Sequence, residues 1–390
     1  MDRFAGTRAP STAPLKCLSA VSLCSPRPAP GAACPVPPVG DAVPTDPLAP
    51  ADVFASTFRE ARPGVAIVGA GAVARALALR LADRGYPILA VVSRTLGPAE
   101  ALARDVGAPV ASDRLADLPA AAALVLLCVP DGDLADLAET LTGVHRPWGR
   151  TVVAHTSGAS PAAILAPLAA EGATVLAFHP LQALTRRADA HVLDGAFVGL
   201  EGDPQAVAAG VELAVGLGLR YAVVAAEAKA RYHLAAAVAS NFTVTLLGIV
   251  QEVLASVGVD RADAMAMMLP LVEGTLRNVA AAGPEDALTG PVARGDVETL
   301  RRHGLALREH LPHLVPAYAA MSVETVRVAV RSGSLAPERA GAVLDLMQRM
   351  VTTPLPPRAV PRGAARYAAD GPWAATVDVP SPIPAWAPER

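Results

Sequence analysis

Lysine is almost absent from this sequence, because Lys16 and Lys229 are the only lysines among its 33 basic residues. Charge of either sign is also not in excess: 36 acidic residues give a formal net charge of -3, which argues against a nucleic-acid-binding protein. The four cysteines form neither a regularly spaced disulfide framework nor a CxxC pair. We therefore expect no metal centre and a reducing, cytoplasmic location.

Long uncharged runs are few as well. The longest, Leu234 to Gln251, approaches the length of a membrane span, but it contains polar side chains such as Ser240 and Asn241. We expect it to form a helix buried in protein rather than to cross a membrane. The apolar patch from Leu18 to Cys24 is too short and too polar for a signal peptide, so we expect the chain to stay unexported.

Proline is unevenly distributed, and many of the 37 prolines lie near the two ends. Residues 1–60 and 351–390 are rich in Pro, Ala and Gly and show little periodicity. Such segments bury too little apolar surface to offset the entropy of the chain. We predict two disordered Pro-rich tails that flank the folded part.

Between the tails, short apolar runs alternate with helix-length segments. The runs cover residues 65–68, 88–92, 124–129, 151–154 and 175–178, and two further extended pieces, 197–200 and 220–224, flank a helical stretch at 204–217. This alternation is typical of a parallel sheet with crossover helices, and after Glu227 only helical patterns remain, up to about Met350. We predict an α/β Rossmann-type domain over 61–200 and a mainly helical substrate-binding or dimerisation domain over 201–350.

The first predicted strand is followed by a glycine motif of the form GxGxxA. Its first residues are Gly69, Ala70, Gly71, Ala72 and Val73. The first glycine allows a tight turn, the second lets the backbone approach a pyrophosphate, and the helix N-terminus faces the anion. The motif predicts dinucleotide binding, and the alternative is a glycine turn without a ligand.

The end of the second predicted strand distinguishes the two nicotinamide cofactors. An NAD site would place Asp or Glu there, whereas this sequence has Ser93, Arg94 and Thr95. Hydroxyl groups and a guanidinium suit a 2′-phosphate. We therefore predict NADP(H) as the cofactor, although Arg94 could also be an ordinary surface arginine.

Further candidates follow the later strands, because ligands of open parallel sheets lie beyond the carboxyl ends of the strands. They are Val129 and Pro130 for the cofactor, and His155, Ser157 and His179 for the substrate or the reaction. Alternative roles are helix capping for the serine and structural hydrogen bonds for the two histidines.

Lys229 opens a helix with a polar stripe. Lys229, His233 and Ser240 fall within about 40° of one another around a regular helix, with Tyr232 on one flank and Asn241 further round on the other. A lysine in a chain that otherwise uses arginine points to chemistry, because the pKa of an ammonium can be tuned. The alternative is a lysine whose stem packs near a helix start.

A later loop, LTGPVARGD, joins two predicted helices. Its Arg294 is placed to meet an anion such as a carboxylate, and Thr289 and Asp296 are further candidates for substrate binding. A solvated arginine and an N-cap aspartate are the alternatives.

These motifs, together with FHPLQ at 178–182, resemble proteins described as a Rossmann-like domain joined to the domain of unknown function 2520. The resemblance covers roughly residues 63–325. It implies a fold akin to that of 6-phosphogluconate, ketopantoate and pyrroline-5-carboxylate reductases, whose helical second domains often dimerise. In hydroxyacid relatives an asparagine stands four residues after the catalytic lysine. Here that position is His233, so their mechanism does not transfer.

The leading hypothesis is an NADP(H)-dependent oxidoreductase that acts on a small carbonyl, imine or hydroxy acid in a crevice between the domains. Lys229 and His233 would supply a proton, Asn241 and His179 would orient the substrate, and Arg294 would bind its carboxylate. We expect a homodimer formed through the helical domain. The alternatives are a non-catalytic dinucleotide-binding sensor or interaction module, and a reductase that uses a deazaflavin.

Overall fold

The computed structural model describes residues 62–352 except 186 and 188. The predicted disordered tails therefore lie outside the described residues, apart from residues 351 and 352, which end the last helix.

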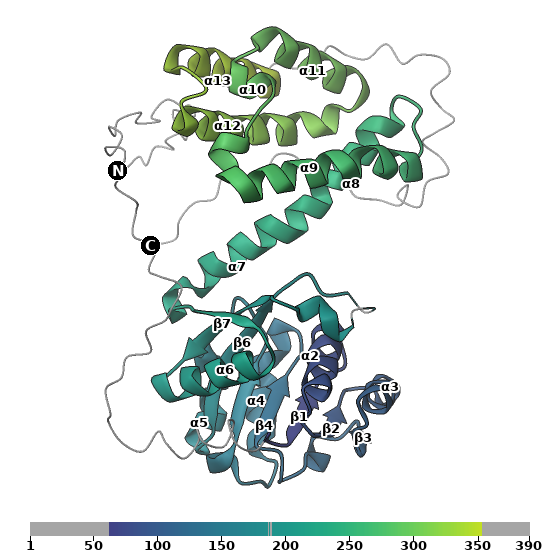
Figure 1. Cartoon of the computed structure of the whole chain (residues 1–390), viewed down its shortest axis with the longest axis vertical. Coiled ribbons are helices and arrows are strands. Elements are labelled where there is room, and N and C mark those ends of the chain that lie inside the picture. Colours follow the sequence, from purple (N-terminus) through teal and green to yellow (C-terminus); the bar gives the residue numbers. More distant parts are fainter. Residues whose placement is uncertain (1–61, 186, 188, 353–390) are drawn as a thin grey trace, which may run out of the picture. The chain divides into compact units, whose positions relative to one another are not determined.

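One sheet organises the first part of the described chain (Figure 1). Its strands are β1 (Val65–Val68), β2 (Ile88–Val92), β3 (Val110–Ser112), β4 (Leu124–Leu127), β5 (Val152–His155), β6 (Thr174–Leu181), β7 (Phe197–Gly202) and β8 (Arg220–Val223). Their order is β3-β2-β1-β4-β5-β6-β7-β8, and only the β6–β7 pair is antiparallel. The first six strands have the order of a doubly wound dinucleotide-binding fold, which confirms the predicted fold class.

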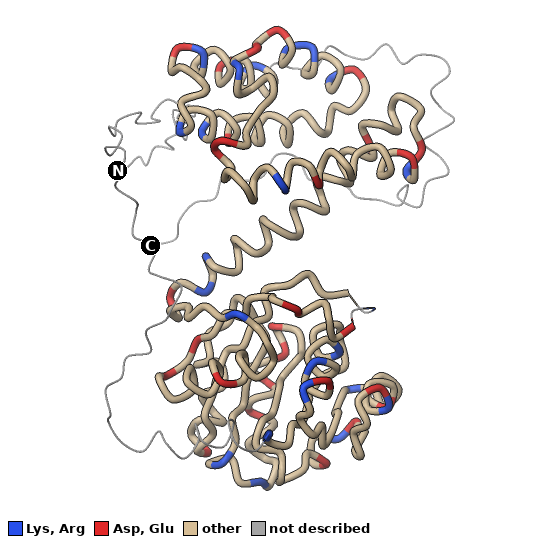
Figure 2. Tube along the Cα trace, in the orientation of Figure 1, with Lys and Arg blue, Asp and Glu red and all other residues tan. Residues whose placement is uncertain are grey.

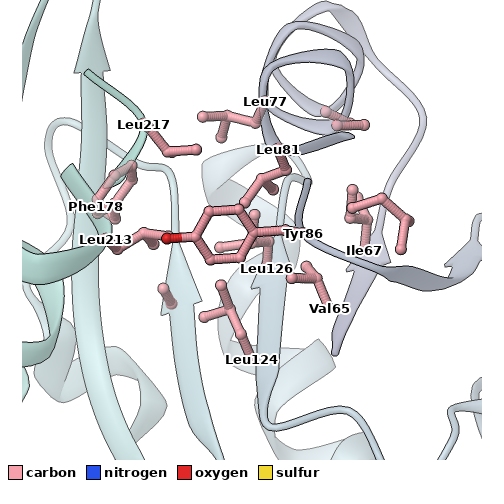
Figure 3. Packing of buried hydrophobic residues seen from close by; sticks show 14 of the residues in the cluster. Val65, Ile67, Leu77, Leu81, Tyr86, Leu124, Leu126, Phe178, Leu213 and Leu217 are labelled. Atoms are coloured by element: carbon pink, nitrogen blue, oxygen red, sulfur yellow. The ribbon is translucent and has the colours of Figure 1, made fainter. Parts of the chain in front are cut away.

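Successive side chains of a strand point to opposite faces of the sheet. Both faces of this sheet are apolar, so helices cover each of them. Val65 and Ile67 of β1 face one core with α2 (Ala72–Asp83), α3 (Leu96–Val106) and α6 (Pro204–Gly216). Ala66 and Val68 face the other core with α4 (Leu134–Thr142) and α5 (Ala166–Ala170). Figure 3 shows the Tyr86 ring among leucine side chains of the first core.

The rest of the described chain is helical, as predicted. A continuous helical run contains α7 (Lys229–Ala237), the π-helical turn η7 (Val238–Phe242) and α8 (Thr243–Ala255). The later helices are α9 (Arg261–Ala287), α10 (Pro291–Arg294), α11 (Val297–His310), α12 (Val315–Ser332) and α13 (Pro337–Thr352). Gly283 interrupts α9 with a φ of 80°, and Gly333 ends α12 in the left-handed region, a conformation that glycine adopts readily.

The strands differ from the predicted ones at three places, namely β3, β4 and β6. The three-residue edge strand β3 was not predicted, because it is too short to show a pattern. Strand β4 ends at Leu127, two residues early, so Val129 and Pro130 lie in the loop. Strand β6 continues to Leu181, because antiparallel pairing with β7 extends its hydrogen-bond ladder, and His179 therefore lies inside a strand rather than after it. The predicted domain boundary at residue 200 falls within β7.

The long helix is not buried in the described chain, apart from Lys229 in its first turn. By length and composition, the helix Ala226–Ala255 is long and apolar enough to cross a membrane. No residue in its most apolar part is buried. Figure 2 shows that charged residues are scarce along it. Leu234 is 59% exposed and Val244 70%. The expectation that this segment is buried in protein was therefore wrong for a single chain, because α9 packs against α8 but leaves these side chains exposed.

Candidate functional site

The loop after β1 has the geometry that a pyrophosphate needs. Gly69 has a φ of +108°, and a β-carbon there would lie 2.2 Å from the carbonyl oxygen of Cys128, so glycine is required for the turn. Gly71 is the exposed N-cap of α2, and nothing lies within 4 Å of the position of its absent β-carbon. No side chain of the described residues caps α2, and its first turn has no acidic residue, so its first N–H groups can bind an anion.

The other predicted cofactor residues lie on neighbouring loops. Ser93, Arg94 and Thr95 follow β2, and Arg94 is exposed, with 82% of its side chain accessible. Its Nη1 atom lies 3.3 Å from Oδ2 of Asp133, at the start of α4. Thr95 is the N-cap of α3 and makes no side-chain capping bond. An exposed guanidinium with one solvent-accessible ion pair can exchange that partner for a phosphate.

The loop after β5 uses its own polar groups for its shape. His155 is fully buried: its Nδ1 accepts the Ser157 N–H at 3.2 Å, and its Nε2 lies 3.3 Å from the carbonyl oxygen of Pro161. The Ser157 hydroxyl accepts the N–H groups of Ala159 and Ser160. Burial and the charge of Lys229 lower the pKa of His155 to about 4. A direct contact of His155 or Ser157 with substrate stays a prediction.

Lys229 is buried at the start of α7. Only 2% of it is exposed, and its Nζ donates a hydrogen bond to the carbonyl oxygen of Ser157 at 3.1 Å. Burial lowers its pKa, while the carboxylates of Glu201 and Asp131 act in the opposite direction. The lysine thus fastens α7 to the loop after β5.

A cavity of about 770 Å³ lies between the end of β6 and the helix α7–η7. Three of the four predicted catalytic residues line it, namely His179, His233 and Asn241, together with Gln182, Tyr232 and Ser240. Lys229 is not among the lining residues. The remaining wall is mainly alanine. The structure therefore brings His179, His233 and Asn241 to one cavity, whereas Lys229 lies outside its lining.

The two histidines differ in their partners. Nδ1 of His179 lies 3.0 Å from the hydroxyl of Tyr232, and the His179 and His233 rings meet edge to face with their centroids 5.9 Å apart. Nδ1 of His233 is buried and has no hydrogen-bond partner among the described residues. Burial, followed by the charge of Lys229, lowers the pKa of His179 to about 4, so its imidazole is neutral at pH 7.

The π-helical turn lies beside the cavity. Ser240 and Asn241 belong to η7, where the helix widens by one residue per turn. The angular positions of a regular helix therefore do not hold beyond Ala237. π-Turns often occur at functional sites, and this one adds two polar side chains to the lining of the cavity.

The segment 289–296 lies elsewhere in the described chain. Thr289 and Arg294 are exposed, and neither lines the cavity. Asp296 is the N-cap of α11, and its carboxylate accepts both the N–H and the hydroxyl of Thr299. The capping role considered for Asp296 is thus observed, whereas substrate contacts of these three residues stay predictions.

The pattern of the sequence gave little sign of three residues of this site. Tyr232 was placed only on the flank of the polar stripe. Gly158 and Gly199 were not recognised, although a β-carbon on either would collide with the His179–Tyr232 pair. The neighbouring YH dipeptide was the available signal for Tyr232, but a contact between β6 and α7 is not visible in a sequence.

Family comparisons agree with this architecture. Residues 49–180 match the Rossmann-like domain, and residues 196–325 match DUF2520, a domain of unknown function. The chain joins a Rossmann-like domain to a DUF2520 domain. This confirms the resemblance found in its motifs.

Solved structures of similar fold extend over most of the described chain. A "putative NADP oxidoreductase" from Bacteroides fragilis is 25% identical, with a TM-score of 0.57, and the match covers 68% of this chain and 98% of that one. A protein from Thermotoga maritima is 26% identical with a TM-score of 0.54 and the same coverage. A reductive aminase from Aspergillus terreus in complex with NADPH and ethyl levulinate is 18% identical over 72% of this chain and 98% of that chain, with a TM-score of 0.52, and shows the fold alone. A comparison with curated proteins finds no match.

Proposed function

We propose that this DUF2520 protein is an NADP(H)-dependent oxidoreductase acting on a small carbonyl, imine or hydroxy acid. The observation that carries the proposal is the cavity in which His179 and His233 lie, next to the carboxyl edge of a sheet that also bears the glycine loop. In doubly wound folds the dinucleotide binds at this edge. The printed name of the Bacteroides fragilis relative, a "putative NADP oxidoreductase", supports the same activity class.

The residues present fit such a cofactor. The open space at Gly71 and the uncapped N-terminus of α2 suit a pyrophosphate, held by the N–H groups of Ala72 and Val73. Arg94, flanked by Ser93 and Thr95, suits a 2′-phosphate. The nicotinamide, when bound, exchanges a hydride with the substrate.

The side chains around the cavity bind and orient the substrate. His179 and His233 offer ring nitrogens, and Asn241 offers an amide that can donate and accept hydrogen bonds. The alanine-rich wall excludes water from the apolar part of a small substrate. Lys229 acts on the cavity without lining it. Its hydrogen bond to Ser157 holds the loop after β5, and its charge helps keep His179 neutral.

Titration of the full chain with NADPH and NADH, followed by a panel of 2-oxo acids and cyclic imines, tests the function. Tight NADPH binding with turnover of at least one class is expected. NADPH binding without any turnover would instead support a non-catalytic dinucleotide sensor. Equal affinity for the two cofactors would contradict the NADP(H) assignment.

We also propose that a second copy of the chain covers the long helix, so that the protein is a homodimer, and that this homodimer is located in the cytoplasm. The exposed apolar side chains on α7, α8 and α9 support this, because monomeric proteins rarely expose so extended an apolar face. A partner chain could also bring Arg294 to the open side of the cavity.

Sedimentation analysis of the detergent-free protein tests the dimer. The expected result is a dimer that Val244→Asp or Leu271→Asp converts to a monomer, whereas Val215→Asp, at an exposed site on α6, leaves it intact. Recovery of the protein only in the membrane fraction, or a monomer at all concentrations, would contradict the proposal.

A further inference from the structure

Two glycines, Gly199 in β7 and Gly158 in the loop after β5, leave space for one hydrogen-bonded pair of side chains. The pair is His179 and Tyr232, with Nδ1 and the hydroxyl oxygen 3.0 Å apart. A β-carbon at Gly199 would lie 2.5 Å from the hydroxyl oxygen of Tyr232, and one at Gly158 would lie 2.9 Å from Nε2 of His179. Neither glycine has a positive φ in the range that other residues avoid, so the requirement at both positions is for space. The absent side chain of Gly199 makes room for Tyr232, and that of Gly158 makes room for the rings of both His179 and His233.

The chemistry of the two groups decides which one donates. A phenol is a stronger acid than a neutral imidazole N–H, and an imidazole nitrogen is a stronger base than a phenolic oxygen. The hydroxyl of Tyr232 therefore donates and Nδ1 of His179 accepts. Burial raises the pKa of Tyr232, so its hydroxyl keeps the proton at neutral pH.

The protonation state of Nε2 in His179 follows from the role of Nδ1. His179 is neutral at pH 7, and a neutral imidazole carries a proton on one nitrogen only. Since Nδ1 accepts, the proton lies on Nε2, the nitrogen on the side of Gly158. His179 also lines the cavity. Because Nδ1 is bonded to Tyr232, Nε2–H is the ring group that His179 has left to offer a ligand of the cavity.

We propose that Tyr232 is a positioning residue that fixes His179 as a hydrogen-bond donor toward the reacting atom of the substrate. This inference rests on the proposed function and narrows its substrate class. An N–H donor binds an atom with a free lone pair, such as a carbonyl oxygen or the nitrogen of a neutral imine. It disfavours a protonated iminium, whose nitrogen has no lone pair to accept the bond.

The chain contains a matched pair outside the site. Nδ1 of His303 on α11 lies 2.9 Å from the hydroxyl of Tyr318 on α12, and the rings meet edge to face as those of His179 and Tyr232 do. Neither His303 nor Tyr318 lines the cavity. Tyr318→Phe therefore removes the same kind of bond without touching the site.

Nitrogen-15 NMR of histidine-labelled full-length protein tests the tautomer without any substrate. The His179 signals are assigned by their loss in His179→Gln. The expected spectrum shows a proton on Nε2 and an unprotonated, hydrogen-bonded Nδ1. In Tyr232→Phe the Nδ1 signal should move as that bond is lost, and in Tyr318→Phe it should stay. A proton on Nδ1 in the unmodified protein, or His179 signals that do not change in Tyr232→Phe, would overturn the inference.

Kinetics supply the second readout once a substrate has been found. Tyr232→Phe should lower kcat for a carbonyl substrate by about three- to tenfold, the effect of one neutral hydrogen bond, with KM nearly unchanged. Tyr318→Phe should change neither constant. An effect of Tyr232→Phe confined to KM, or a faster reaction with protonated iminium substrates than with carbonyls, would contradict the role. If the protein has no turnover, the proposed function fails, while the NMR result still decides the tautomer.

Discussion

Lys229 donates a hydrogen bond from its ammonium to the carbonyl oxygen of Ser157, across 3.1 Å. This contact links the start of α7 to the loop after β5, at a position where the lysine is almost fully buried. The charge that it places there helps lower the pKa of both His155 and His179, after the larger effect of burial. The lysine thus influences the cavity although it does not line it.

Lys229→Met should raise the pKa of His179 from about 4 toward its ordinary value of 6.5. Removal of a nearby positive charge favours the imidazolium, while the burial that remains keeps the pKa below 6.5. An NMR titration of the His179 ring measures this shift. Arg231→Met, at an exposed position on the same helix, is the control and should leave the titration unchanged. An unaltered pKa in Lys229→Met would show that the lysine charge is screened from the ring.

Stability should fall as the pH is lowered from about 6.5 to about 4. His155 and His179 have folded-state pKa values of about 4, against 6.5 in the unfolded chain, so the unfolded state binds more protons in this window. Each histidine can contribute a slope of at most about 1.4 kcal/mol per pH unit. Urea unfolding at several pH values measures the slope. His155→Gln should reduce it, because it removes one of the two histidines with a lowered pKa.

The positions of most strands were predictable, because short apolar runs alternate with helix-length segments along the chain. Antiparallel pairing of β6 with β7 was not, since the run at 197–200 carries no sign of its partner. That pairing places His179 within a strand, opposite Gly199. Sequence periodicity therefore identified His179 as a residue near the end of a strand, but it placed the end of that strand too early.

The candidate site was predictable where one element carries several of its residues. His233 and Asn241 belong to one helix, and their polar character in an apolar run was visible in the sequence. The role of Gly158 was not, because it depends on two rings that come from β6 and α7. The burial of Lys229 behind the cavity likewise depends on packing between distant segments.

Substitution by alanine should affect stability at Gly69 and NADPH binding at Gly71. Gly69→Ala should reduce the free energy of unfolding by about 1–3 kcal/mol or more, because φ is +108° and the β-carbon meets the Cys128 carbonyl. Gly71→Ala should change stability by less than about 0.5 kcal/mol, as its surroundings are open. It should nevertheless weaken NADPH binding, because the β-carbon enters the space that the pyrophosphate requires. Thermal unfolding and fluorescence titration separate the two effects, and unchanged NADPH affinity in Gly71→Ala would argue against the site.

Arg94→Ala should weaken NADPH binding by about 10- to 100-fold, the effect of losing hydrogen bonds to a charged group, and leave NADH binding nearly unchanged. Asp133→Asn removes the competing carboxylate of Arg94 and should maintain or strengthen NADPH binding. Calorimetric titration of both cofactors against both variants measures the preference. Equal losses for NADPH and NADH in Arg94→Ala would mean that the guanidinium does not meet the 2′-phosphate.

Gly158→Ala should disable the cavity without unfolding the protein. Its β-carbon would lie 2.5 Å from Nδ1 of His233 and 2.9 Å from Nε2 of His179, so both rings have to move. We expect a stability loss of about 1–3 kcal/mol, typical of overpacking, and a larger relative loss of activity, because the displaced rings no longer face the substrate together. NADPH affinity should be retained, since Gly69 and Gly71 are untouched. Gly341→Ala on α13, where a β-carbon meets nothing within 4 Å, is the control and should preserve both activity and stability. Full activity in Gly158→Ala would show that the two histidines do not act on the substrate from their observed positions.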